Sequence, residues 1–173
     1  MRGRRVTGGS IAAAAAVLLF LVASSGDTIV EAQSQNKGAN LVGTWFVSTP
    51  AGLTAFITYH QGGTLVEMRS HEFGGPPRPG DGRSSLRGVW RRVGGQFESV
   101  AYSFTFDGTN GDALRIVRVR HEFSLDPGFE TAAGDIFVAQ WFCPTALTCP
   151  DPSATDPDIP EFPAGYFTQK RLP

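Results

Sequence analysis

The amino-acid sequence predicts an all-β fold, an eight-stranded antiparallel up-and-down β-barrel. Beyond residue 40 the hydrophobic period of an α-helix is almost absent, and strand-like stretches alternate with turns rich in Gly, Pro and Asp. Most links between these stretches are short, which favours antiparallel neighbours because parallel strands need long crossover connections. We count eight such stretches, enough to close a small barrel.

Two segments are expected to precede the barrel. Residues 1–32 have the pattern of a signal peptide, with three arginines near the start and an apolar run of 13 residues that is too short to span a membrane. Small residues offer two cleavage sites, after Ser25 and after Ala32. The second is preferred because residues 33–40, rich in Gln, Ser and Asn, suit a flexible tail of the mature chain.

Residues 41–173 are then expected to form one domain. Its predicted strands lie at residues 41–49, 53–61, 64–70, 87–93, 96–106, 113–125, 130–142 and 166–172. Gly62-Gly63 and Gly94-Gly95 are expected to form two-residue hairpin turns, because glycine accepts positive φ values at no steric cost. Residues 107–112 and 126–128 supply a longer hairpin loop and another turn.

Two longer links interrupt this pattern. Residues 71–86 contain Pro76, Pro77 and Pro79, whereas residues 143–165 contain six of the twelve prolines and four acidic residues but no basic one. Loops of this length in a compact barrel are mouth or lid elements, or solvated segments. The sequence leaves both alternatives open.

The two cysteines of the chain, Cys143 and Cys149, lie in the second of these links. We expect them to form a local disulfide, since the signal-like start indicates an exported, secreted or periplasmic protein. In the chain-entropy model, closing so small a loop stabilises the fold by about 2 kcal/mol.

The charge of the chain restricts its partners. Residues 1–32 carry three basic and two acidic residues, so removing them changes the formal net charge from −1 to −2. A domain that is not basic is not expected to bind nucleic acid. No later stretch is long and apolar enough to span a membrane, and we expect a monomer.

Gly43-Thr44-Trp45, on the first predicted strand, resembles the Gly-x-Trp signature of lipocalins and of the wider calycin superfamily. The chain as a whole is similar to small exported bacterial proteins with a lipocalin-like barrel. The resemblance implies that Trp45 plugs the closed end of the barrel. It also implies that an arginine after the last strand, here Arg171, lies over the Trp45 ring, a contact worth about 0.5–2 kcal/mol.

Strand alternation suggests which side chains line the interior. The aromatic face of residues 96–106 is expected to point inward and its small polar face outward. On residues 113–125 the arginines take the solvent face, which sends His121 inside. The expected lining of a ligand cavity is Phe56, Tyr102, Phe104, Val119, His121, Phe123, Phe137 and Trp141. An apolar, aromatic cavity with a few polar points is typical of small-molecule sites.

The histidines give no metal or cofactor prediction. His60 precedes a Gly-Gly turn and is expected in solvent, whereas His71 opens the first long link and is expected at the rim. In the pairs His71-Glu72 and His121-Glu122, neighbouring side chains point to opposite faces of a strand, so neither pair forms a local metal site.

The function expected from the sequence is the binding of a small hydrophobic molecule inside the barrel. Two alternatives stay open: a barrel-type cyclase or isomerase in which His121 or Tyr102 moves a proton, and a filled structural barrel whose loops bind a partner. The chain has no nucleophile elbow, phosphate-binding loop, dinucleotide fingerprint or zinc-helix motif, so no catalytic residue is assigned.

Overall fold

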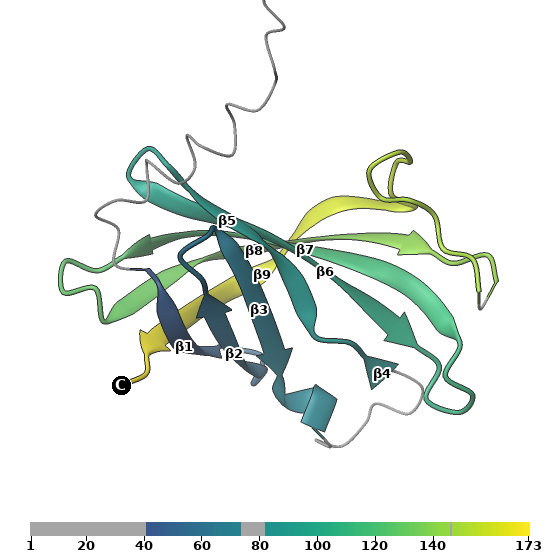
Figure 1. Ribbon diagram of the computed structural model, residues 1–173, viewed down its shortest axis with the longest axis horizontal. Helices are drawn as coiled ribbons and strands as arrows, with labels where there is room; N and C mark the ends of the chain where they lie inside the picture. Colours follow the sequence, from purple (N-terminus) through teal and green to yellow (C-terminus); the bar gives the residue numbers. More distant parts are fainter. Residues whose placement is uncertain (1–40, 74–81, 146) are drawn as a thin grey trace, which may run out of the picture.

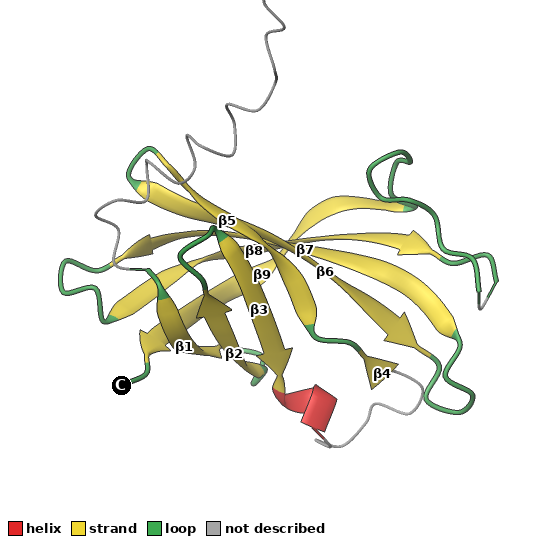
Figure 2. Ribbon diagram, in the orientation of Figure 1, coloured by secondary structure: helices red, strands yellow, loops and turns green. Residues whose placement is uncertain are grey.

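The computed structural model describes residues 41–73, 82–145 and 147–173. These residues form nine strands and one short 3₁₀ helix, η1 (Figure 2). The elements are β1 (Gly43–Ser48), β2 (Thr54–Tyr59), β3 (Thr64–Arg69), η1 (Ser70–Phe73), β4 (Gly82–Arg83), β5 (Leu86–Val93), β6 (Gln96–Phe106), β7 (Ala113–Leu125), β8 (Thr131–Phe142) and β9 (Ile159–Arg171). The predicted signal peptide and the tail at 33–40 lie outside the described residues.

Eight of the strands close into an antiparallel barrel. Each barrel strand pairs with its neighbours in the chain, from β1 to β3 and from β5 to β9, and β3 pairs directly with β5. The barrel closes where β9 pairs back with β1, while β4 only adds two residues beside the end of β6. This up-and-down order confirms the predicted fold class.

The barrel is much deeper on one side than on the other. The strands β1, β2 and β3 have six residues each, whereas β6 has 11, β8 has 12, and β7 and β9 have 13 each. Because β1 pairs only with residues 168–171 of β9, the strands β6 to β9 continue past the short strands as a four-stranded sheet (Figure 1). We call this part the extended sheet.

The last strand is longer than predicted. β9 begins at Ile159 rather than at residue 166, although it contains Pro160 and Pro163. Within the described chain, residues 159–167 pair with β8 alone, so the strand is an edge here and tolerates the missing N–H groups of proline. The loop predicted at residues 143–165 therefore ends at Asp158.

One end of the barrel is plugged as the lipocalin resemblance implies. The guanidinium of Arg171 lies 4.6 Å from the centre of the Trp45 ring, and the Trp45 indole N–H donates to the carbonyl of Leu41 at 2.8 Å. Arg171 also donates to the carbonyls of Val42 and Phe129, at 2.9 and 3.1 Å. The hairpins that follow β2, β5 and β7 lie at this plugged end, and the remaining links lie at the far end.

The glycine of the Gly-x-Trp motif has a physical reason at this plug. Gly43 has a φ of +136°, a conformation that side chains rarely adopt, and a Cβ there would lie 3.1 Å from Nη1 of Arg171. Because Gly43 has no side chain, the guanidinium of Arg171 can pass close to the start of β1 and lie over the Trp45 ring.

Aromatic rings fill the interior next to the plug. Tyr59, Trp90, Phe97, Phe123 and Phe167 are each at most 4% exposed. Their rings form an unbroken series of contacts with centroid distances between 5.6 and 6.1 Å, the range of favourable aromatic pairs. This part of the barrel is a packed core.

The predicted orientation of β6 is wrong. The small side chains of its other face point into the core and are at most 3% exposed: Ser99, Ala101, Ser103 and Thr105. Tyr102 and Phe104, predicted inside, lie on the outer face and are 38% and 42% exposed. The reason is space, because rings from four other strands and Phe97 at the start of β6 already occupy the narrow interior, and the rest of β6 contributes the small side chains that fit beside them.

Three further residues predicted to line the interior also lie on the outer face. Phe56 is 43% exposed and its ring packs against Phe46 at 5.6 Å, while its neighbours on β2 are buried. Phe137 and Trp141 of β8 lie beside arginines of β7: the guanidinium of Arg120 lies 4.2 Å from the Phe137 ring, and that of Arg118 lies 5.6 Å from the ring of the buried Trp141. Aromatic side chains here are covered by outer-face arginines instead of by the core.

The predicted disulfide is confirmed. Cys143 and Cys149 are bonded, with their Cα atoms 4.2 Å apart. The backbone N–H of Cys143 also donates to the carbonyl of Leu114 at 2.9 Å, so the start of the link between β8 and β9 is fixed to β7. This link lies at the end of the extended sheet, away from the plug (Figure 1).

Candidate ligand-binding sites

A cluster of polar side chains lies inside the barrel against the aromatic rings. We call it the interior polar cluster; its members come from β2, β3, β6, β7 and β9 and are Tyr59, Glu67, Arg69, Ser99, His121 and Gln169. None of them is more than 8% exposed. Glu67 and Arg69 share the inner face of β3 with Leu65, opposite Ile57 and Ala55 of β2.

The cluster contains a buried ion pair. Nε of Arg69 donates to Oε1 of Glu67 at 2.6 Å, and both side chains are less than one-tenth exposed. A charge taken out of water is costly unless it is paired and hydrogen-bonded, and apolar residues of similar volume are often as stable or more stable in such positions. Stability alone therefore gives little reason for a charged pair in this core.

His121 is held neutral in the same cluster. Its Nδ1 lies 3.0 Å from the hydroxyl oxygen of Ser99, and its ring lies 4.9 Å from that of Phe167. Burial lowers the pKa of His121 to about 4, while the nearby negative charge of Glu67 opposes this shift and Arg69 adds to it. At neutral pH the imidazole is therefore uncharged.

Tyr59 and Gln169 join the cluster across the barrel. The Tyr59 hydroxyl donates to Oε1 of Gln169 at 3.3 Å. Burial raises the pKa of the Tyr59 hydroxyl, and the charge of Glu67 raises it further, so the group stays a hydrogen-bond donor. Nε2 of Gln169 is buried and has no hydrogen-bond partner within the described chain, which leaves an amide donor unsatisfied inside the barrel.

The far end of the barrel adds a further carboxylate. η1 follows β3 directly, and Glu72 on it accepts a hydrogen bond from the Ser85 hydroxyl at 3.0 Å. Burial raises the pKa of Glu72, whereas the nearby charge of Arg69 lowers it. The ion pair of β3 therefore lies close to the 3₁₀ helix at the far end. His71, predicted at the rim, has a side chain outside the described ones.

The eight side chains predicted to line one cavity fall into two groups. Val119, His121 and Phe123 of β7 face the interior, as predicted, and are at most 2% exposed. The other five lie outside: Phe56, Tyr102, Phe104, Phe137 and Trp141. His60 is exposed, as expected for a residue beside the Gly62-Gly63 turn.

Of the interior polar cluster, only His121 was predicted from the sequence. Ser99 was expected on the outer face of its strand, and the other four members were given no site role. A usable signal exists in β3, where Glu67 and Arg69 share a strand face with Leu65 while Val66 and Met68 share the other. Two opposite charges that are two residues apart, on the same strand face as a large apolar residue, are compatible with a buried ion pair. Alternation alone does not decide between the two faces.

A cleft lies on the outer face of the extended sheet, between β6, β7 and the link that follows β8. Its volume is about 370 Å³, and its lining consists of Tyr102, Ser103, Phe104, Ile116, Asp151, Pro152 and Ser153. Trp141 stands beside it, with its ring 6.3 Å from that of Tyr102 and its indole N–H donating to the carbonyl of Thr155 at 3.0 Å. We call this the outer cleft.

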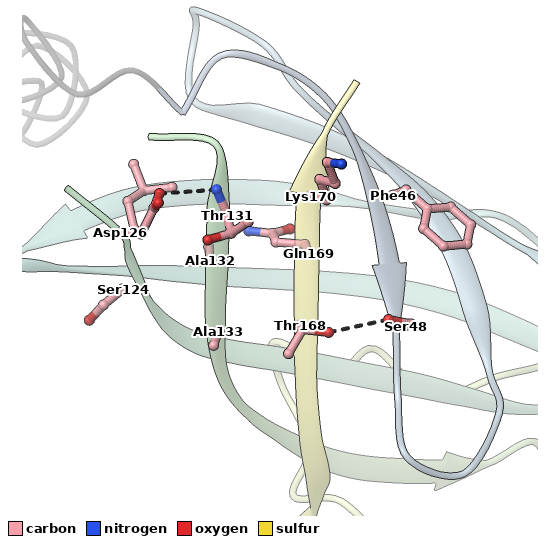
Figure 3. Close-up of a pocket in the computed structure, with 11 residues that line it drawn as sticks. Phe46, Ser48, Ser124, Asp126, Thr131, Ala132, Ala133, Thr168, Gln169 and Lys170 are labelled. Carbon is pink, nitrogen blue, oxygen red and sulfur yellow. Dashed lines mark hydrogen bonds between the residues drawn. The ribbon is translucent and has the colours of Figure 1, made fainter. Parts of the chain in front are cut away.

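A second hollow lies over β1, β9, β8 and β7 near the plugged end (Figure 3). Its volume is about 620 Å³. Phe46 and Lys170 stand on one side of it and Asp126 on the other, with small side chains such as Ala133 between them. Two pairs of its polar groups are bonded to each other: Asp126 accepts from the Thr131 N–H at 3.0 Å, and the hydroxyls of Ser48 and Thr168 lie 3.2 Å apart.

Metal-binding groups and membrane-spanning helices can be judged for residues 41–73, 82–145 and 147–173. No group of three or more His, Cys, Asp or Glu side chains there is arranged to hold a metal ion. No helix in that part of the chain has the length and apolar character needed to cross a membrane.

Comparison with models of protein families, with curated proteins and with solved structures finds no match to this chain. What is established is a closed, eight-stranded antiparallel barrel, compatible with a lipocalin-like barrel, that carries a disulfide and a buried polar cluster.

Proposed function

We propose that this chain is an exported, calycin-like barrel that binds a small, largely apolar molecule in its interior, between the aromatic rings and the far end. The observation that carries the proposal is the buried Glu67–Arg69 pair, with neutral His121 and the unsatisfied Gln169 amide beside it. A filled structural barrel has no use for these groups, since an apolar core would be at least as stable.

The chemistry of the cluster suggests the polar part of the ligand. Gln169 offers an amide N–H, and the guanidinium of Arg69 has N–H groups beyond the one that Glu67 accepts. Because Glu67 already balances the charge of Arg69, a neutral acceptor such as a carbonyl or ether oxygen fits better than an anion. The small side chains of β6 and Gly88 of β5 would face the apolar part.

Export is supported by the disulfide, which persists in oxidising compartments. The calycin assignment is supported by the closed barrel and by the Trp45–Arg171 plug. A catalytic role for the same interior is the weaker proposal. A histidine with a pKa of about 4 is a poor general base at neutral pH, and Tyr102, the other candidate proton carrier, lies on the outside of the barrel.

The first test is native mass spectrometry of the protein from the culture medium or periplasmic extract of its own organism, compared with the denatured mass. We expect additional mass that is lost on denaturation, and extraction then identifies the molecule. The same protein stripped of ligand should bind the neutral dye Nile red with a saturable 1:1 curve. An apo mass together with no dye binding would overturn the proposal.

A matched pair of variants on β9 localises the binding. Gln169→Leu keeps the volume but removes the amide donor, and we expect it to weaken binding of the extracted ligand by about tenfold, the effect of one hydrogen bond. Thr168→Val, one residue away on the outer face, should leave binding unchanged. Equal affinity in both variants would argue against an interior site at Gln169.

A further inference from the structure

The outer cleft is a second candidate site, independent of the barrel interior. Its two rings, Tyr102 and Phe104, stay about two-fifths exposed although a loop lies directly beside them. The volume of about 370 Å³ is within the range of small-molecule pockets, about 300–1,000 Å³. Exposed aromatic residues that form a hollow, and not a flat surface, point to a ligand.

The loop wall of the cleft is held in place by several bonds. The Cys143–Cys149 disulfide closes the start of the loop, and Trp141 binds the carbonyl of Thr155. The N–H of Phe142 donates to the carboxylate of Asp158 at 2.7 Å near the end of the loop. The cleft is therefore preformed, which lowers the entropy lost when a ligand binds.

A carboxylate is oriented at the rim of the cleft. Oδ1 of Asp151 accepts from the Ser153 N–H at 2.8 Å and from the Ser153 hydroxyl at 2.7 Å, while Oδ2 has no hydrogen bond within the described chain. The bonds from Ser153 lower the pKa of Asp151, so the carboxylate is ionised at neutral pH. The loop from residue 143 to residue 158 contains three acidic residues and no basic one.

The same outer face already uses aromatic rings to hold cations. Arg118 lies over Trp141 at 5.6 Å and Arg120 lies over Phe137 at 4.2 Å. Both guanidiniums are also paired with Glu161 of β9. Among the described residues no cation of the chain lies over Tyr102 or Phe104, the two rings that stand beside Asp151.

We propose that the outer cleft binds a small organic cation, an ammonium group on an apolar body, between the rings of Tyr102 and Phe104 and the carboxylate of Asp151. Two residues on one strand face lie about 7 Å apart, so both rings can contact one alkylated ammonium group. Aromatic faces attract such cations through their quadrupole, and quaternary ammonium groups are recognised in this way. The carboxylate supplies the opposing charge.

The test compares a cation with its neutral isostere. Benzyltrimethylammonium and neopentylbenzene have the same shape but differ in charge. We expect the full-length secreted protein to bind the cation at least about tenfold more tightly, the equivalent of one cation–π and ion-pair contact. Equal affinity for both probes, or no saturable binding of the cation, would overturn the proposal.

The three tryptophans of the chain report where the probe binds. Their indole N–H groups give separate NMR signals; Trp141 lies beside the outer cleft, whereas Trp45 and Trp90 lie in the barrel interior. We expect the cation to shift the Trp141 signal alone. A shift confined to Trp45 or Trp90 would place the probe in the barrel and contradict the proposal, while leaving the interior site as it stands.

Two isosteric variants test the charge. Asp151→Asn can keep its acceptor oxygen on Ser153, so the loop retains its bonds, and we expect it to lose most of the preference for the cation. Asp156→Asn removes the same charge from another exposed residue of the loop and should bind like the unchanged protein. If both variants lose the preference for the cation equally, the preference comes from the total negative charge of the loop, and a site at Asp151 is refuted.

Discussion

Among the glycines of the barrel, replacement of Gly88 or Gly134 by alanine is expected to destabilise the fold most. A Cβ added at Gly88 would lie 2.0 Å from the carbonyl oxygen of Val100 and 2.5 Å from Cα of Ala101, both backbone atoms of β6. Carbon and oxygen approach to about 3.3 Å, so β5 and β6 would have to separate by about 1.3 Å. No side-chain rotation relieves such a contact.

The cost of Gly88→Ala follows from that displacement. Hydrogen bonds of about 2.9 Å would stretch beyond bonding distance, and losing two of them costs about 2 kcal/mol. Displaced core side chains add about 1–3 kcal/mol, and the reduced entropy of the unfolded chain returns about 0.5–1 kcal/mol. We expect the free energy of unfolding to fall by about 2–4.5 kcal/mol, which lowers the urea midpoint by about 1–2 M.

The assay is urea unfolding followed by tryptophan fluorescence. Gly95→Ala is the control, since a Cβ at Gly95 meets nothing within 4 Å and its φ is not positive. This variant should be as stable as the unchanged chain or slightly more stable. A Gly88→Ala midpoint equal to that of Gly95→Ala would refute the close approach of β5 and β6.

Three further outcomes are expected. Arg171→Met removes the cation over Trp45 and two hydrogen bonds to carbonyls. It should lower the free energy of unfolding, measured by urea unfolding, by about 1–2 kcal/mol. An unchanged value would mean that the contact between Arg171 and Trp45 does not stabilise the fold. His121 has its pKa lowered to about 4 from an ordinary value near 6.5, so the stability it gives as a neutral group is complete above pH 6.5 and is lost as the pH falls towards 4. The free energy of unfolding should therefore differ less between pH 7 and pH 4.5 in His121→Gln than in the unchanged protein, by about 2–3 kcal/mol. An equal difference in both proteins would contradict this. Replacing Cys143 and Cys149 together by Ser should cost about 2 kcal/mol by loop entropy, measured as a lower midpoint that added reductant no longer changes.

The sequence predicted which segments are strands far better than which faces are buried. Residues 96–106 and 113–125 are strands with the predicted bounds, because their turns contain glycine and aspartate that mark the ends. On β7 the faces follow from the arginines, which cannot be buried without partners. Over residues 99–106 of β6 one face is aromatic and the other consists of small side chains, and hydrophobicity alone chose the wrong face.

Barrel geometry decides the orientation of β6, and no single strand contains that information. Gly88 of β5 lies opposite Ala101, where only small groups fit. Rings from four other strands fill the interior, so the aromatic face of β6 turns outward to the loop beyond β8. The candidate sites were predictable to the same extent: His121 was predicted inside, whereas Glu67 and Arg69 were not predicted as site residues, because charged side chains are buried only where partners from other strands meet them.

The free edge of β9 has a consequence for how copies of this protein behave towards one another. Within the described chain one side of residues 159–167 is unpaired, and such a strand is a template on which another chain can pair. Pro160 and Pro163 remove N–H groups from this strand, and Glu161 between them is fixed to Arg118 and Arg120. Prolines and a charged residue on an unpaired edge are devices by which natural sheets avoid edge-to-edge association, and we expect the same effect at residues 159–167 of this strand.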